Sequence, residues 1–322
     1  MLRLDAQTLS VVRGKKTIIK DINLSFRGGE LVALLGPSGS GKSTLLKAMC
    51  GFSPGDGDVF LGDKELYANF DEYRMMLGYV PQDDLVHQLL RVSATLDYAS
   101  KLRLPEDIPE PLRKAKVKQV LKSLELEEHS DKPVKSLSGG QRKRVSVAVE
   151  LLAEPPVLFL DEPTSGLDPA LEEASMQLFR RLTNSQRITL VTTHVLTSLD
   201  CVDIVVFMCE GHVLFVGPPE SAAEHFQVDH LLSIYKVLTP DRVNEHKRRF
   251  EQSELYYEYI SNRLTEARLP LGELQNDSTV AQNMVSAEAK SEAEPQATEN
   301  KRTKKTAEER LQELKKQRNR RG

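Results

Sequence analysis

The sequence predicts an α/β fold built around a phosphate-binding loop. Up to about residue 226, short apolar runs alternate with stretches of helical periodicity, as expected for strands covered by helices. The apolar run at residues 31–35 leads directly into a glycine-rich stretch, GPSGSGKST, at 36–44. Two further apolar runs, at 157–160 and 188–191, are followed by polar side chains. In open α/β sheets ligands bind at such strand ends.

Composition limits the classes of function. The chain has 322 residues, a net charge of −3 and a pI near 6.2, which argue against nucleic-acid binding. Cys50, Cys201 and Cys209 lie in apolar stretches without metal-ligand spacing, as expected for buried thiols in a reducing compartment. No secretory leader is evident, and no run approaches the roughly 18–20 apolar residues of a membrane span. We therefore expect a cytoplasmic protein.

The composition changes late in the chain. We expect the main domain at residues 1–228, followed by a more charged helical extension at 229–269. Residues 270–306 are rich in Ala, Ser, Glu, Gln, Asn and Thr, which predicts a disordered linker. Residues 301–322 contain ten Lys or Arg against three Glu, so 307–322 is interpreted as a basic tail with helix-forming character. Both a solvated tail and contact with an anionic membrane surface fit this pattern.

The glycine-rich stretch has the P-loop spacing G-x-x-x-x-G-K-S and the strand–loop–helix context that this motif requires. Its glycines let backbone N–H groups surround phosphates without Cβ clashes. Lys42 would reach phosphate oxygens, and the Ser43 hydroxyl would bind Mg²⁺. A purely structural turn would leave the Lys-Ser-Thr unexplained. The predicted phosphate-binding residues are Gly36, Pro37, Ser38, Gly39, Ser40, Gly41, Lys42, Ser43 and Thr44.

Adjacent carboxylates end the apolar run at 157–160, a continuous run typical of a central parallel strand. Side chains alternate along a strand, so Asp161 and Glu162 cannot do the same job. One can hold the Mg²⁺ shell while the other addresses the attacking water. A lone pair of this kind would ordinarily be a solvated strand end, but its combination with a P-loop favours a functional pair.

Two more polar residues follow predicted strands. His194 comes just after the strand at 188–191, at the expected edge of the sheet, where it could contact a γ-phosphate. Gln82 follows the apolar segment of MLGYVPQDD, and its neutral side chain could reach a water molecule or Mg²⁺. A lone His is usually structural, but its place at the same edge of the sheet as the P-loop and Glu162 favours the γ-phosphate contact, whereas a loop Gln taken alone is ordinarily solvated.

Residues 137–152, LSGGQRKRVSVAVELL, contain a second glycine turn directly before a helical run. The free backbone N–H groups at such a helix start can bind an anion. One chain thus carries two candidate anion sites about a hundred residues apart, more than a single nucleotide requires.

In chain order, the motifs GPSGSGKST, YVPQ, LSGGQ, VLFLDE, SGLD and TTH resemble the full motif set of the ATP-binding cassette (ABC) ATPases, over roughly residues 2–226. The resemblance implies a P-loop NTPase core with a mixed sheet, an antiparallel β subdomain and a helical subdomain inserted at about 84–150. It implies ATP and Mg²⁺ as cofactors. It also accounts for two anion sites, because two such cassettes pair head to tail and each ATP lies between the P-loop of one and the LSGGQ turn of the other.

The resemblance implies a role for each matched residue. The catalytic set is Glu162 as general base, His194 as switch histidine and Gln82 as γ-phosphate sensor and link to a membrane partner. The metal set is Ser43, Gln82 and Asp161. The helical subdomain is expected to rotate toward the core when ATP bridges two cassettes. Residues expected to contact nucleotide from the partner cassette or at the interface are Ser138, Gly139, Gly140, Gln141 and Asp168.

One departure concerns the nucleotide base. Many members of the family stack the adenine on an aromatic residue upstream of the P-loop, where this sequence has Val11 or Val12. An aliphatic contact lacks the stacking geometry of an aromatic ring, so we expect weak discrimination between ATP and GTP.

The stretches GGQRKRVSVAVELL and LDEPTSGLDPALE resemble the G-type (white/sterol-exporter-like) group and its bacterial relatives. This resemblance implies an ATPase subunit on the inner face of the cell membrane that drives transport, in the export direction, through a separate permease. The alternative is a soluble cassette ATPase of DNA maintenance or translation, although such relatives usually carry a coiled coil, zinc-binding cysteines or a second cassette. A P-loop kinase is disfavoured by the LSGGQ turn.

Overall fold

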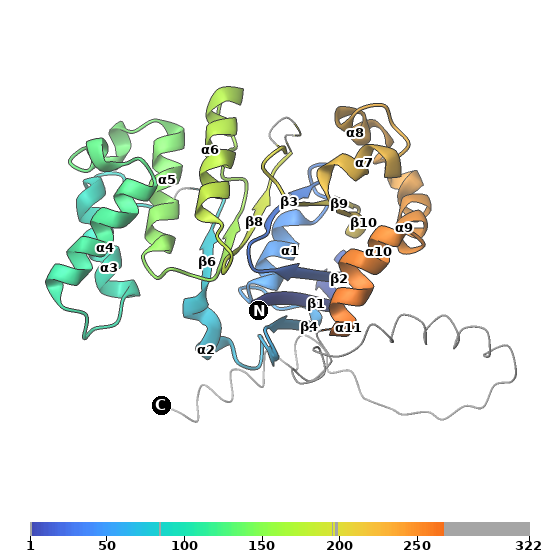
Figure 1. The fold of residues 1–322 in the computed structure, drawn as a ribbon, viewed down its shortest axis with the longest axis horizontal. Helices are drawn as coiled ribbons and strands as arrows, with labels where there is room; N and C mark the ends of the chain where they lie inside the picture. The colour runs from blue at the N-terminus through green and yellow to red at the C-terminus, as the bar shows by residue number, and fades with distance from the viewer. Residues whose placement is uncertain (1, 84, 195, 197–198, 267–322) are drawn as a thin grey trace, which may run out of the picture.

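The computed structural model describes residues 2–83, 85–194, 196 and 199–266, which form two sheets and several groups of helices (Figure 1). The strands are β1 (Arg3–Arg13), β2 (Lys16–Arg27), β3 (Leu31–Leu35), β4 (Asp56–Leu61), β5 (Lys64–Glu65), β6 (Leu77–Val80), β7 (Val157–Leu160), β8 (Ile188–Thr192), β9 (Ile204–Cys209) and β10 (His212–Gly217).

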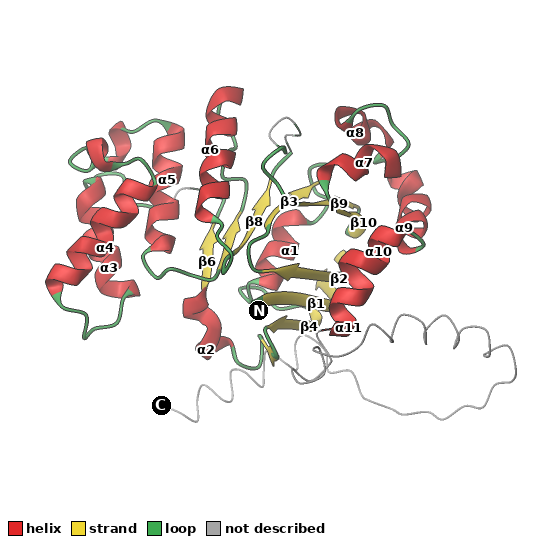
Figure 2. Cartoon of the chain, in the orientation of Figure 1, coloured by secondary structure: helices red, strands yellow, loops and turns green. Residues whose placement is uncertain are grey.

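The helices occupy the connections between these strands and the C-terminal part of the described chain (Figure 2). They are α1 (Lys42–Met49), α2 (Phe70–Tyr73), α3 (Val92–Arg103), α4 (Glu110–Ser123), α5 (Gly139–Leu151), α6 (Pro169–Leu182), α7 (Pro219–His225), α8 (Ile234–Val237), α9 (Val243–Glu251), α10 (Glu254–Tyr256) and α11 (Asn262–Glu266). Short 3₁₀ turns lie at Arg74–Met76, Glu127–His129, Val134–Ser136, Leu231–Ser233 and Pro240–Arg242, and a π-helical turn at Tyr257–Ser261.

The central sheet has the order β10-β9-β3-β8-β7-β6. All neighbouring pairs are parallel except β9 and β10, so the sheet is mixed, as predicted. Every residue of β3, β7 and β8 is buried. Their continuous apolar sequences reflect strands that are covered on both faces.

A second, antiparallel sheet has the order β2-β1-β4-β5 and forms the predicted β subdomain. Its long strands pair in the register Leu4 with Phe26 and Ala6 with Leu24, and these four side chains are fully buried. Helix α1 contacts β1 and β2 of this sheet as well as β8 of the central sheet. The helix that follows the phosphate loop therefore lies between the two sheets.

Helices α3, α4 and α5 form a group on the far side of α6 from α1 (Figure 1). The whole group is inserted between β6 and β7, which are neighbouring parallel strands. Helix α5 begins at a capping box in which the Ser138 hydroxyl accepts from the Gln141 N–H while the Gln141 side chain accepts from the Ser138 N–H. Helix α6 begins at Asp168, followed by Pro169 at its first position.

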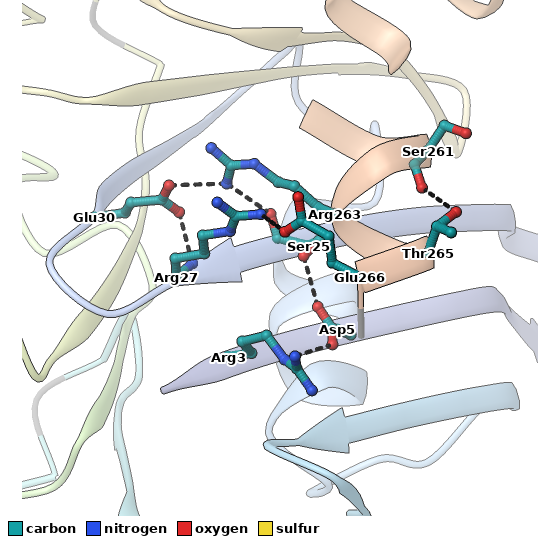
Figure 3. A network of polar contacts seen from close by, with 9 residues as sticks. All are labelled: Arg3, Asp5, Ser25, Arg27, Glu30, Ser261, Arg263, Thr265 and Glu266. Carbon is teal, nitrogen blue, oxygen red and sulfur yellow. Dashed lines mark hydrogen bonds and ion pairs between the residues drawn. The ribbon is translucent and has the colours of Figure 1, made fainter. Parts of the chain in front are cut away.

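The last described helices return to the β subdomain. Figure 3 shows how α11 and the turn before it meet β2 and the turn that follows it: Arg27 pairs with Glu266, and Arg263 donates to Glu30 at 2.8 Å. Burial raises the pKa of Glu30, and the Arg263 guanidinium opposes this effect. These ion pairs join the end of the described chain to its first strands.

The predicted helical extension at 229–269 coincides in part with described helices between 234 and 266. The predicted linker at 270–306 and basic tail at 307–322 lie outside the described residues. The domain limits remain predictions. Within the described part of the chain, no helix combines the length and apolar character needed to cross a membrane.

Candidate functional site

The phosphate loop begins where β3 leaves the central sheet. Gly36 has a φ of +145°, and a Cβ built there would lie 2.1 Å from the Met208 carbonyl oxygen of β9. Gly41, the N-cap of α1, has a φ of +105° and would place a Cβ 2.8 Å from Ile19. Both positions require glycine, so the loop passes close to neighbouring strands and turns directly into the helix.

The Lys42 ammonium lies inside this loop. Its Nζ donates to the carbonyl oxygens of Gly36 at 2.7 Å and Pro37 at 3.1 Å. The residue is only 7% exposed, and this burial lowers the pKa of Lys42 while Glu162 and Asp161 oppose the shift. The buried Lys42 ammonium thus bonds to neutral carbonyl oxygens of the loop. The negative charge of a bound phosphate would neutralise this cation better than they do.

Asp161 accepts hydrogen bonds from several elements of the site. It follows β7, is 2% exposed, and accepts three hydrogen bonds. Its Oδ1 accepts from Ser43 Oγ at 2.8 Å and from Thr192 Oγ1 at 2.9 Å, and its Oδ2 accepts from Tyr79 Oη at 3.1 Å. Each donor comes from a different strand or helix, so the carboxylate ties α1, β8 and β6 together.

Two predicted metal ligands, Ser43 and Asp161, are therefore in direct contact. A hydroxyl and a carboxylate are hard oxygen donors of the kind that Mg²⁺ prefers, with remaining positions left to water and phosphate oxygens. Within the residues that the structure describes, no group of three His, Cys, Asp or Glu side chains could hold a metal alone. The donor set fits an ion shared with a nucleotide better than a dedicated protein cage.

Glu162 takes a strained backbone conformation, with a φ of +46°. Its N–H donates to Thr192 Oγ1 at 2.7 Å, so the same threonine hydroxyl orients both carboxylate residues. Its Oε2 accepts from Gln82 Nε2 at 2.8 Å. The structure thus places Asp161 and Glu162 in different surroundings, as the strand alternation predicts.

Gln82 contacts Glu162, whereas the other two predicted metal ligands contact each other. The backbone around Gln82 is held by Lys143 of α5, whose Nζ donates to the carbonyl oxygens of Pro81 at 3.0 Å and Gln82 at 2.6 Å. Through this lysine the helix that follows the LSGGQ turn is attached to the loop that contacts Glu162.

His194 lies just beyond β8 and is exposed. Within the described part of the chain it makes no hydrogen bond. Burial raises the pKa of Glu172 on α6, and the nearby His194 opposes this rise. The structure therefore brings His194 to the correct edge of the sheet without joining it to Glu162.

The LSGGQ turn does not belong to the same site. Ser138 and Gly139 are exposed at the start of α5, and Figure 1 places α5 on the opposite side of α6 from α1. Gln141 is occupied in the capping box and contacts His129 at 2.8 Å. Asp168 caps α6 by accepting from the Leu171 N–H at 3.0 Å. The chain thus carries two separate candidate anion sites.

Comparison with known proteins decides the family. The model of the ABC transporter family matches residues 19–165. The chain carries the ATP-binding domain of an ABC transporter. It is an ABC ATPase domain, and the reaction of this domain is ATP hydrolysis.

The curated relatives include G-type transporters and a bacterial protein, as the sequence motifs predict. An ABC transporter ATP-binding/permease protein of Mycobacterium tuberculosis is 44% identical over 232 residues, covering 71% of this chain and 27% of that protein. ABC transporter G family member 28 of Arabidopsis thaliana is 33% identical over 257 residues, which are 76% of this chain and 22% of that protein. The chain therefore spans about a quarter of the length of these relatives.

Solved structures confirm the cassette fold. CbiO1 of Clostridium perfringens, part of the ABC transporter complex cbiONQ, has a TM-score of 0.63 and 29% identity, covering 75% of this chain and 97% of that one. A bacterial ABC transporter cassette in a dimeric structure has a TM-score of 0.60 and 25% identity, covering 67% of this chain and 98% of that one. A dimeric cassette in a post-hydrolysis state bound to ADP and Pi gives the same values.

The two valines at the position expected to face the adenine differ in exposure. Val11 is buried in the core of the cassette, whereas Val12 is 54% exposed. Only Val12 could therefore present its side chain to a base.

Three side chains of the site were missed by the sequence analysis, namely Tyr79, Thr192 and Lys143. Thr192 lies within the quoted TTH motif, and its place at the end of a strand beside the carboxylates was the available signal. Tyr79 reads as a core aromatic of a short strand, and Lys143 is one of three cations in the stretch QRKR. Only the fold distinguishes them from their neighbours.

Replacement of Lys42 by Ala should weaken binding of ATP to the cassette. A hydrogen bond to a charged group contributes roughly 1.5–3 kcal/mol, which corresponds to about a tenfold to hundredfold rise in the dissociation constant. Isothermal titration with Mg-ATP measures this constant. Lys47→Ala, in the last turn of the same helix, is the matched control and should bind as the wild type does. Unchanged binding by Lys42→Ala would contradict the assignment of the loop.

Proposed function

We propose that this chain hydrolyses ATP in a head-to-tail dimer of cassettes and thereby drives transport, in the export direction, through a separate membrane permease. The observation that carries the proposal is the division of the candidate residues between two places. The phosphate loop, both carboxylates and Gln82 converge on one site, while the LSGGQ turn lies exposed on another surface.

We assign the triphosphate to the phosphate loop, with Lys42 and the backbone N–H groups from Ser38 to Thr44 against its oxygens. Ser43 and Asp161 would hold Mg²⁺, which when bound neutralises charge on the phosphates. Gln82 is proposed to sense the γ-phosphate from its place on Glu162 and to reach the ion once nucleotide binds. His194 would turn to the γ-phosphate from the exposed end of β8.

Glu162 is the proposed general base. The attacking water would give a proton to its carboxylate as the water oxygen bonds to the γ-phosphorus, and the bond to the bridging oxygen breaks to leave ADP and phosphate. The strained backbone and the hydrogen bond from Gln82 fix the direction of this carboxylate. Most of the catalysis is then positioning of water and stabilisation of charge.

A second cassette would complete the site. Its Ser138, Gly139 and Gly140 would offer a hydroxyl and backbone N–H groups to the γ-phosphate, with Gln141 holding the turn and Asp168 at the interface. The capping box at the start of α5 uses the Ser138 and Gln141 N–H groups and leaves those of Gly139 and Gly140 outside its two hydrogen bonds, which supports this role. The dimeric structures of a related cassette support this arrangement.

Exposed apolar side chains support a membrane partner. Leu85 and Leu89 follow the Gln82 loop and are 78% and 79% exposed, and Leu102, near the C-terminal end of α3, is 83% exposed. Exposed apolar side chains of this size on the inserted helical group and the loop that leads into it favour a protein contact there. We propose that a transmembrane partner covers this surface and holds the chain on the inner face of the cell membrane, where the basic tail could meet anionic lipid.

Replacement of Glu162 by Gln should stop turnover while leaving nucleotide binding intact. The amide keeps the shape and the contact with Gln82 but cannot accept the proton, so ATP hydrolysis should fall by about a hundredfold or more. Phosphate release and Mg-ATP titration measure the two properties separately. Glu173→Gln on the exposed face of α6 is the control. A Glu162→Gln variant with wild-type turnover would show that another group is the base.

Membrane association tests the transport function. In membranes from the native cells, the tagged chain should be isolated with a protein that has transmembrane helices, and crosslinks from position 102 should reach that protein. Leu89→Glu and Leu102→Glu should release the chain from the membrane. Leu232→Glu, at an exposed leucine of the C-terminal part, should not. Isolation with ribosomes or DNA, or free in the cytosol, would contradict transport and favour a non-transport cassette ATPase.

A further inference from the structure

Tyr79 lies on β6, three residues before Gln82, and its hydroxyl reaches across to the neighbouring strand β7. There its Oη donates to Asp161 Oδ2 at 3.1 Å. Ser43 and Thr192 both bind Oδ1, so the tyrosine is the donor that holds the second oxygen. Without it, the carboxylate would be fixed at one oxygen only and could turn about its Cβ–Cγ bond.

The Tyr79 ring is held in place by aromatic packing. Phe52, which follows α1, meets it edge to face with the ring centroids 5.2 Å apart and the planes at 87°. Phe52 also packs edge-on against Phe70 of α2 at 6.5 Å. Edge-to-face contacts of this geometry stabilise the orientation of a ring. The hydroxyl is therefore aimed at Asp161 by groups that do not themselves touch the site.

The backbone of Tyr79 is connected to the inserted helices. Its N–H donates to Glu150 Oε2 of α5 at 3.3 Å, and the other oxygen of Glu150 pairs with Arg103 of α3. Glu150 is 8% exposed, and its burial raises the pKa of its carboxyl against the effect of Arg103. Tyr79 therefore contacts the inserted helices through its main-chain N–H and the buried Asp161 carboxylate through its side chain.

The Tyr79 hydroxyl is the donor in its contact with Asp161, because a carboxylate oxygen accepts. A phenylalanine would preserve the ring packing and lose this donation alone.

We propose that Tyr79 is a positioning residue that holds Asp161 in the orientation needed to bind the metal ion, and that it thereby sets the affinity of the nucleotide site for the ion. This inference rests on the proposed role of Asp161 as a metal ligand. Tyr79 acts through the carboxylate and does not itself bind metal or phosphate.

The experiment measures metal binding directly, using Mn²⁺ as the probe ion for electron paramagnetic resonance. All variants carry Glu162→Gln so that ATP is not consumed. In the presence of saturating ATP, Tyr79→Phe should raise the Mn²⁺ dissociation constant by about tenfold, the loss of one charge-assisted hydrogen bond. ATP binding in EDTA should be unchanged. Tyr98→Phe, on the exposed face of α3, is the control and should match the parent.

Three further variants, Asp161→Asn, its combination with Tyr79→Phe, and Tyr79→Leu, separate the possible failures. Asp161→Asn should weaken Mn²⁺ binding more than Tyr79→Phe does, and combining the two should add little, because both act on one carboxylate. If Asp161→Asn is impaired and Tyr79→Phe binds Mn²⁺ normally, the inference about Tyr79 is overturned while the proposed site stands. If only Tyr79→Leu is impaired, the ring alone matters and the inference is wrong. Normal Mn²⁺ binding by Asp161→Asn would overturn the proposed metal role and the inference together.

Discussion

The buried carboxylate of Asp161 is the interaction on which the rest of the nucleotide site depends. A charge at this depth is tolerated only when it is hydrogen-bonded, and its partners come from three segments that are distant in sequence. Ser43 is the second residue of α1, Thr192 ends β8 and Tyr79 belongs to β6. Satisfying one carboxylate thus brings the phosphate loop, the region before His194 and the strand before Gln82 to the same edge of the sheet.

The same site is attached to the inserted helices at two points. Lys143 of α5 holds the carbonyl groups around Gln82, and Glu150 of the same helix binds the main chain of Tyr79. The helix that begins at the LSGGQ turn is thereby coupled to both carboxylates of its own chain. We propose that this helix moves when its LSGGQ turn contacts a second nucleotide. Such a movement would change the position of Gln82 and hence its contact with Glu162.

Local sequence signals predicted the α/β core, whereas the mixed sheet, the antiparallel β subdomain and the inserted helices were predicted from the family resemblance. Continuous apolar runs predicted the buried strands β3, β7 and β8, and the glycine spacing predicted the loop into α1. Ser43 was predicted as a metal ligand from the P-loop, and Asp161 was added to that set by the family resemblance; the structure brings the two side chains into contact. The roles of Tyr79 and Lys143 could not be predicted, because an aromatic in a strand and a cation in a basic helix look like ordinary core and surface residues. Their function depends on cross-strand register and on the packing of α5, which no local pattern encodes.

The phosphate loop of one chain and the LSGGQ turn of a second chain are proposed to hold one nucleotide between them in a dimer. The molar mass of Glu162→Gln, measured by light scattering during size-exclusion chromatography, tests this claim most directly. We predict a monomer without nucleotide and a dimer with Mg-ATP, and a return to monomer when Ser138 is replaced by Arg in the same background. A protein that stays monomeric with Mg-ATP would contradict the claim, and would mean that the LSGGQ turn is used by a different partner.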